Sequence, residues 1–195
     1  MWEGIRNFVL SNEKQSSMNW KEELDHISKE VNEKFGALSK EQLFAQPDPK
    51  RWSIAQNLQH LIQVNESYFP IFNRLEKRDL PQPFIGKIAF FRKLFGNMIY
   101  QSVSDGGKKK VKTFPLWEPS ILEKEEDILG KFLEQQEALK QWIERLQPFI
   151  EKEAVIHSPA NKLIVYTLPK ALDIIVAHER RHLDQALNVK SILIF

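Results

Sequence analysis

Apolar residues recur at steps of three and four along four separate stretches of the chain, which is the period of an amphipathic helix. These stretches cover residues 19–38, 53–78, 120–146 and 167–190. No stretch alternates apolar and polar residues convincingly, as a half-buried strand would. The pattern therefore predicts an all-α protein with four long helices.

Start signals accompany all four stretches. The first and second begin with capping residues followed three positions later by Glu or Gln, and the third opens with Pro and Ser before Glu123. The fourth is predicted to begin near Thr167, with Pro169 tolerated in its first turn. The capping residues of the first three stretches are Asn19, Ser53 and Ser120. Four such amphipathic faces bury best against one another, which predicts an antiparallel four-helix bundle.

A long connection, residues 79–118, separates the second and third helices. Within it, residues 84–100 carry aromatic and aliphatic residues at helical spacing, interleaved with basic residues. We interpret this segment as an elaborated inter-helix connection packed over one end of the bundle, compatible with a cover over a pocket. A membrane-surface helix or a dimer interface are the other interpretations. Residues 1–18 are predicted to form an N-terminal arm, and the chain 1–195 a single domain.

Composition narrows the function classes. The 195 residues are 42% hydrophobic and 28% charged, with a net charge of +2. A net charge this small gives no strong electrostatic attraction to nucleic acid or to an anionic membrane. The absence of cysteine excludes disulfides, thiolate zinc ligands and a cysteine nucleophile within the chain. No apolar run approaches the length of a membrane span, and the N-terminus reads as neither a signal peptide nor an anchor. We expect a cytoplasmic protein.

Two histidines lie in the middle of the apolar line of the last helix. His178 and His182 are one turn apart, so a neutral imidazole pair could hold a divalent metal from the same side. His60 faces inward from the second helix and could complete a set of three. Three imidazoles leave a coordination position open, which is the catalytic rather than the structural arrangement. The alternative is a group of core histidines satisfied by hydrogen bonds.

The string from His178 to His182 also matches the zinc-protease pattern H-E-x-x-H. Those proteases need a third ligand downstream of the motif, and the only downstream carboxylate here, Asp184, points away from the histidine face. We therefore disfavour a peptidase. Glu179 lies one position off that face. We expect it at the surface rather than as a hydrogen-bond partner of the metal-binding histidines. Asn65 interrupts the stripe of the second helix, as a partner of the site or a wet interior position.

The order of four short motifs resembles the DinB-like superfamily. The motifs are Arg51-Trp52-Ser53, His60-Leu61, His157-Ser158-Pro159 and the run His178-Glu-Arg-Arg181-His182-Leu-Asp-Gln185. The resemblance implies a four-helix bundle, often dimeric, with a divalent metal held by three histidines, which by position are His60, His178 and His182. It also implies, for some members, transfer of a low-molecular-weight thiol such as bacillithiol, mycothiol or glutathione.

Three functions follow from this set of observations. Imidazole binds both Zn²⁺ and Ni²⁺ well, so the ligand type does not determine which metal the site would hold. Because the chain lacks cysteine, a nucleophilic thiol would have to arrive on a cosubstrate, which favours a metal-dependent thiol transferase with a small-molecule substrate. A metal-dependent hydrolase of a small molecule and a non-catalytic metal-binding bundle are the alternatives. Arg51, Arg92 and Lys93 could bind substrate carboxylates, although solvated surface is the more common role. We expect a homodimer.

Overall fold

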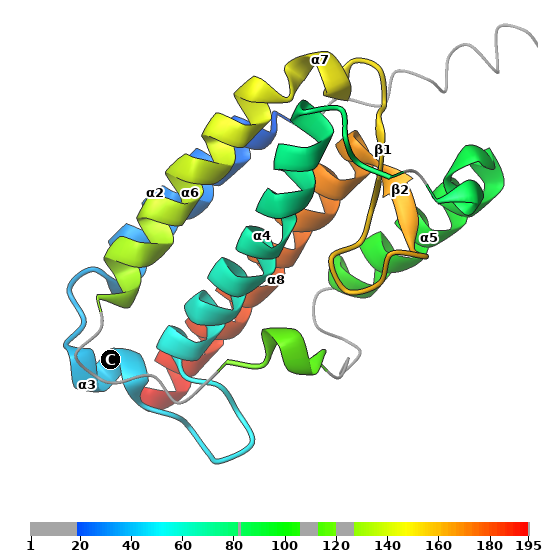
Figure 1. Cartoon of the computed structure of the whole chain (residues 1–195). Coiled ribbons are helices and arrows are strands. Elements are labelled where there is room, and N and C mark those ends of the chain that lie inside the picture. The colour runs from blue at the N-terminus through cyan, green and yellow to red at the C-terminus, as the bar shows by residue number, and fades with distance from the viewer. Residues whose placement is uncertain (1–18, 82, 106–112, 120–126, 195) are drawn as a thin grey trace, which may run out of the picture.

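The computed structural model describes residues 19–81, 83–105, 113–119 and 127–194. Within this part of the chain, four long helices pack as a bundle, with α2 and α4 each lying against both α6 and α8 (Figure 1). Their bounds are Trp20–Phe35 for α2, Ile54–Glu76 for α4, Ile128–Arg145 for α6 and Leu168–Leu193 for α8. The predicted all-α four-helix bundle is confirmed.

Shorter elements connect the bundle helices. They are α3 (Lys40–Phe44), the 3₁₀ turns η1 (Phe84–Lys87) and η2 (Pro115–Trp117), α5 (Ala89–Val103), α7 (Gln147–Ile150) and the strands β1 (Val155–His157) and β2 (Val165–Thr167). Between α4 and α6, the connection therefore contains a helix of its own. The helix expected over residues 84–100 is present, although its first residues form η1 and its last turn extends to Val103.

The predicted helix starts agree with the caps that the structure shows. Asn19 accepts a hydrogen bond from the backbone of Glu22, and Thr167 caps α8. Ser53 and Gln56 form a reciprocal capping box at the start of α4. The predicted start at Ser120 lies outside the described residues, as does the N-terminal arm. The described α6 begins at Ile128, where the side chain of Asp127 accepts from the amide of Gly130.

The prediction of a chain without strands is wrong at one place. β1 and β2 pair antiparallel, with Ile156 opposite Tyr166, and β2 runs directly into α8. Each strand has three residues, too few for an alternating pattern to stand out from the sequence. This hairpin matters for the site because it places the buried side chain of Tyr166 beside α4 and α5.

Helix α5 packs on α8 and β2 rather than in the four-helix ring (Figure 1). Gly96 allows this close approach, because a Cβ at this position would lie 2.8 Å from Cγ of Lys170 and 3.3 Å from Cβ of Tyr166. The opposite side of α5 leaves large apolar side chains exposed, among them Phe90 and Leu94. Within the described residues, no helix is long and apolar enough to span a membrane.

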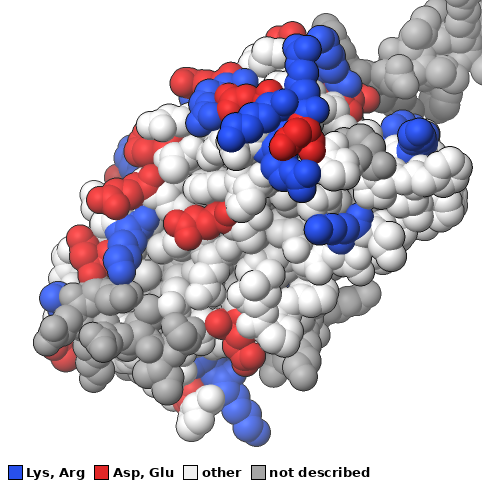
Figure 2. Space-filling model, viewed as in Figure 1, with Lys and Arg blue, Asp and Glu red and all other residues white. Residues whose placement is uncertain are grey.

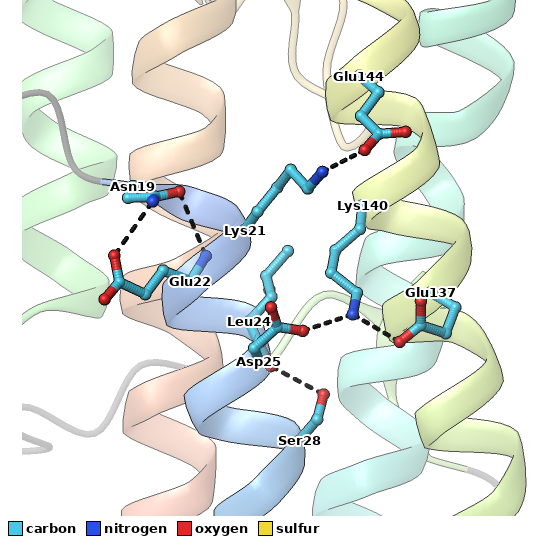
Figure 3. A network of polar contacts seen from close by, with 9 residues as sticks. All are labelled: Asn19, Lys21, Glu22, Leu24, Asp25, Ser28, Glu137, Lys140 and Glu144. Carbon is cyan, nitrogen blue, oxygen red and sulfur yellow. Dashed lines mark hydrogen bonds and ion pairs between the residues drawn. The ribbon is translucent and has the colours of Figure 1, made fainter.

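Charged pairs cover the outer side of the bundle, where α2 and α6 lie side by side. Lys21 pairs with Glu144, and Lys140 bridges Asp25 and Glu137 (Figure 3). Charged side chains of both signs gather over this side of the molecule, whereas the end that carries α5 is mostly uncharged (Figure 2). Such exposed pairs contribute roughly 0–1 kcal/mol each, so the apolar core dominates the stability of the bundle.

Candidate metal centre

Three histidines from two neighbouring helices meet on one side of the bundle. His60 comes from α4, and His178 and His182 come from α8, one turn apart. One nitrogen from each ring lies within 4.8 Å of the others. The ring centroids are 5.1 Å apart for His60 and His178, 4.5 Å for His60 and His182, and 4.6 Å for His178 and His182. The structure thus brings together the three histidines that the sequence singled out.

A backbone carbonyl orients the ring of His60. Its Nδ1 lies 2.7 Å from the carbonyl oxygen of Trp117, in η2. A carbonyl oxygen can only accept, so Nδ1 carries the proton and donates. The lone pair of His60 is therefore on Nε2, the nitrogen that faces His178 at 3.3 Å.

A side-chain amide orients the ring of His182 in the same way. Nδ1 of His182 lies 3.0 Å from Oδ1 of Asn57. The amide group of Asn57 cannot be reversed without loss, because its Nδ2 donates to the carbonyl oxygen of Ser53 at 2.9 Å. Nδ1 of His182 therefore donates, and its Nε2 keeps a free lone pair. Two of the three imidazoles thus have their tautomer fixed by a neighbouring acceptor, as metal-binding histidines usually do.

His178 is held less tightly than the other two histidines. Its Nδ1 is buried and has no hydrogen-bond partner within the described residues. Its side chain is partly exposed, whereas His60 and His182 are 3% and 7% exposed. An orphaned nitrogen in a buried site is costly unless another group compensates for it.

The donor set fits a divalent metal ion. Three neutral imidazoles are a common ligand set for zinc with one position open. Two ligands of a tetrahedral zinc lie about 3.4 Å apart when each Zn–N bond is about 2.1 Å, and Nε2 of His60 and Nε2 of His178 are 3.3 Å apart. This group of histidines could hold a metal ion.

Electrostatics favour the neutral form of the imidazoles. Burial lowers the pKa of His60, against a smaller opposing effect of its bond to Trp117. Burial, together with the neighbouring histidines and the charge of Arg181, lowers the pKa of His178 and His182. A neutral ring keeps its lone pair for a ligand, which is the form that metal binding requires.

An aromatic side chain forms one wall of the centre. The indole of Trp52, in the turn before α4, stacks on His182 with centroids 5.8 Å apart and planes at 22°. It also lies 5.0 Å from the ring of His60. Trp52 thus shields two of the imidazoles and limits the rotation of their rings.

Glu179 is fully buried, and the prediction that it lies at the surface is wrong. Its Oε1 accepts from the amide groups of Asn65 at 2.7 Å and Gln136 at 2.9 Å. Burial raises the pKa of Glu179 to about 7, partly offset by these two hydrogen bonds. Glu179 points away from the histidines into the bundle, where polar residues of α4, α6 and α8 meet. Asn65 is therefore a buried polar member of this interior network, and its hydrogen bonds go to Gln135 and Glu179 rather than to a histidine.

A signal for the burial of Glu179 was present in the sequence. Residue 179 continues a second apolar line along the last helix, at steps of three and four. The other members of that line are all buried: Leu172, Val176, Leu183 and Ala186. A carboxylate on such a line, with polar residues interrupting the stripes of two other helices, indicates an interior network rather than a solvated position.

A cavity of about 760 Å³ opens from the histidine centre. All three histidines line it, together with residues of α5 and with Phe114 and Trp117 of the connection. Helix α5 and the described residues Phe114 and Trp117 therefore cover a pocket, which is the cover that the interpretation of segment 79–118 allowed. The size is within the usual range of small-molecule sites, roughly 300–1,000 Å³.

The other candidate residues lie in different places. His26 is exposed on α2. His157 is buried, and its Nδ1 lies 3.0 Å from the carbonyl oxygen of Ser158. Arg51 lines the cavity, whereas Arg92 donates to the carbonyl oxygen of Gly86 and Lys93 is exposed. Of these three cationic residues, only Arg51 lines the cavity.

Comparison with known protein families gives one result that covers most of the chain. The model of the DinB superfamily matches residues 23–186, a span that includes all three histidines. Comparison with curated proteins gave no significant match. Comparison with solved structures gave none either.

Proposed function

Since the chain belongs to the DinB superfamily, we propose that it binds a divalent metal ion, Zn²⁺ or Ni²⁺, through His60, His178 and His182. We propose further that it uses this centre to transfer a low-molecular-weight thiol to a small electrophilic substrate. The observation that carries the proposal is a pair of histidine rings, His60 and His182, that line a large cavity. A neighbouring acceptor fixes the tautomer of each ring, which leaves Nε2 free to bind a metal ion. A purely structural site is usually closed by a fourth protein ligand.

The chemistry follows from what each partner supplies. A bound divalent ion supplies positive charge that lowers the pKa of a thiol placed against it. The thiol releases its proton to water, and sulfur donates an electron pair to an electrophilic carbon. A carbon–sulfur bond forms, and the bond from that carbon to the leaving group breaks with its electron pair. The chain contains no cysteine, so the sulfur belongs to the cosubstrate.

The residues of this chain have separate tasks in the proposal. Trp117 and Asn57 hold the two rings in the tautomer that presents Nε2. Trp52 excludes water from one side of the rings. The cover formed by α5, Phe114 and Trp117 limits access of water to the rest of the cavity.

Metal analysis of the purified protein tests the first part. We expect about one equivalent of metal in the wild type and in His26→Ala, whose histidine is exposed and belongs neither to the group of three nor to the cavity lining. His60→Ala and His178→Gln should lose most of it, while circular dichroism shows that the helical fold is kept. Unchanged metal content in both site variants would sink the assignment.

A conjugation assay tests the second part. Metal-loaded protein is incubated with bacillithiol, mycothiol or glutathione and 1-chloro-2,4-dinitrobenzene, from which the thiolate displaces chloride. We expect a thioether-forming rate that requires both thiol and metal and that falls to background in His60→Ala. If no thiol supports turnover with either metal, but 4-nitrophenyl acetate is cleaved without thiol, the protein is a hydrolase. Metal binding without either reaction would mean a non-catalytic bundle.

Two further expectations accompany the proposal. A cytoplasmic location suits a reaction that consumes reduced thiols, because that compartment keeps them reduced. A homodimer remains a prediction, and sedimentation equilibrium of the purified chain tests it.

A further inference from the structure

The cavity beside the histidines has two halves of different chemistry. Helices α4 and α8 run antiparallel here, since Asn57 pairs with His182 and Asn65 pairs with Glu179. The later residues of α4 therefore face the earlier residues of α8, and together they form the inner half of the cavity. The start of α4 and the end of α8 form the outer half.

The inner half is lined mainly by apolar side chains. Val64 and Tyr68 follow His60 on the same face of α4, about 6 and 12 Å further along the helix axis. Ile174, one turn before His178, faces them from α8. Helix α5 adds Ile99 and Val103 as the cover. We call this half the inner chamber.

A pair of tyrosines bounds the inner chamber without offering a charge. The hydroxyl groups of Tyr68 and Tyr166 are 2.8 Å apart and bond to each other. Both side chains are almost fully buried, and burial raises the pKa of Tyr166 to about 12. Their hydroxyl groups thus stay neutral and satisfy each other, so this boundary of the chamber carries no charge.

The outer half is mixed in polarity and carries the cationic residues of the lining. Among the described residues that line the cavity, three are cationic and none is Asp or Glu: Lys50, Arg51 and Arg181. Arg51 pairs with Asp48 and Arg181 with Asp105, whereas Lys50 forms no ion pair within the described part of the chain. Gln185 and Asn188 of α8 add polar groups to this side, and Trp52, Val189 and Ile192 add apolar ones.

We infer that the substrate of this centre carries an uncharged aromatic or branched aliphatic group, which the inner chamber binds beside the histidines. The inference rests on the proposed function for calling this molecule a substrate. Its physical basis is the cost of desolvating charge. An ionised group in the inner chamber would lose its hydration without a partner, whereas an apolar group gains about 25 cal/mol for each Å² removed from water.

Ligand binding to the metal-loaded protein tests the inference, with 2-naphthol and 2-naphthalenesulfonate as matched probes. They share the naphthalene body and differ in charge, and a sulfonate coordinates zinc poorly. Calorimetry should show 2-naphthol binding at least tenfold more tightly. Val103→Trp fills the inner chamber from the half-buried cover and should weaken 2-naphthol at least tenfold. Leu94→Trp adds the same ring on the exposed side of α5, outside the cavity, and should leave the affinity unchanged.

Two results would overturn the inference. The first is equal 2-naphthol affinity in wild type and Val103→Trp, provided both give the same circular dichroism spectrum. The second is tighter binding of the sulfonate, lost in Lys50→Glu, because the outer half would then be the main binding site. Metal content is measured on the same samples. If the wild type holds no metal but Val103→Trp still weakens 2-naphthol binding, the proposed function alone is contradicted. If the wild type holds metal but Val103→Trp binds 2-naphthol as tightly as the wild type does, this inference alone is contradicted.

Discussion

Asn57 fixes the ring of His182 from the opposite helix, with its Oδ1 3.0 Å from Nδ1 of the imidazole. The amide is itself oriented by the carbonyl oxygen of Ser53, the residue that caps the start of α4. The start of one helix thereby determines which nitrogen of a histidine on another helix carries the proton. The hydrogen bonds of such outer partners orient the ligating ring and raise its basicity, and their loss lowers metal affinity.

Asn57→Leu should therefore weaken metal binding about 10–100-fold, because it removes the acceptor while keeping a side chain of similar size. Competition with a chromophoric chelator measures the affinity. Asn57→Asp keeps an acceptor oxygen and should stay within a few-fold of the wild type. Asn97→Leu, an exposed change on α5, serves as the control. Equal affinities for wild type and Asn57→Leu would show that this hydrogen bond does not hold a ligand.

Glu179 is predicted to stabilise the fold rather than to catalyse a reaction. Glu179→Leu removes the acceptor of two buried amides, those of Asn65 and Gln136, and should cost about 2–4 kcal/mol. Glu179→Gln keeps an acceptor in place and should lie within about 1 kcal/mol of the wild type. Urea unfolding at neutral pH measures both. Glu134→Leu, on the exposed side of α6, controls for the change in residue type. A Glu179→Leu protein as stable as this control would rule out the network as a source of stability.

The helical bundle could be predicted from the sequence because its signals are local. The spacing of apolar residues determines each buried face, and the capping residues at Asn19 and Ser53 determine where the helices begin. The inward direction of His60, His178 and His182 follows from the same spacing. Their meeting requires only that two helices pack side by side, which is the normal outcome for a bundle.

What the sequence did not predict depends on contacts between distant segments. The acceptor for His60 is the main-chain carbonyl group of Trp117, and a carbonyl group leaves no mark in the residue type. The burial of Glu179 depends on Asn65 and Gln136 lying at the same depth in neighbouring helices, and helical spacing alone does not give that depth. The pairing of β1 and β2 involves too few residues to produce a pattern.

The hydroxyl pair of Tyr68 and Tyr166 should couple the hairpin to α4. Each Tyr→Phe change should cost about 1 kcal/mol, and Tyr166→Phe more than Tyr68→Phe, because Tyr166 also bonds to Ser158. The double variant should cost less than the sum of the two, with a coupling of about 1 kcal/mol in a double-mutant cycle. Strictly additive costs would show that the two hydroxyl groups act independently.

This tyrosine pair also gives a dependence on pH. Burial raises the pKa of Tyr166 from 10.0 to about 12, so the folded protein holds a proton that the unfolded chain releases. The contribution of the pair is therefore complete below pH 10 and is lost as the pH rises toward 12. Unfolding measured across this range should show a shallower decline in Tyr166→Phe than in the wild type.

Arg181 attaches the cover of the cavity to the helix that carries two histidines. Its Nη1 donates to the carbonyl oxygen of Ser102 at 2.9 Å and to Asp105 at 2.5 Å, at the end of α5. Arg181→Gln should loosen this attachment at a cost of about 1–3 kcal/mol. Hydrogen exchange should then accelerate in the last turn of α5, and 2-naphthol should bind less tightly, since Val103 covers the inner chamber. Arg180→Gln is the matched control, because Arg180 pairs with Glu23 and Glu30 on α2 instead. Equal exchange in both variants would mean that apolar packing alone holds α5 in place.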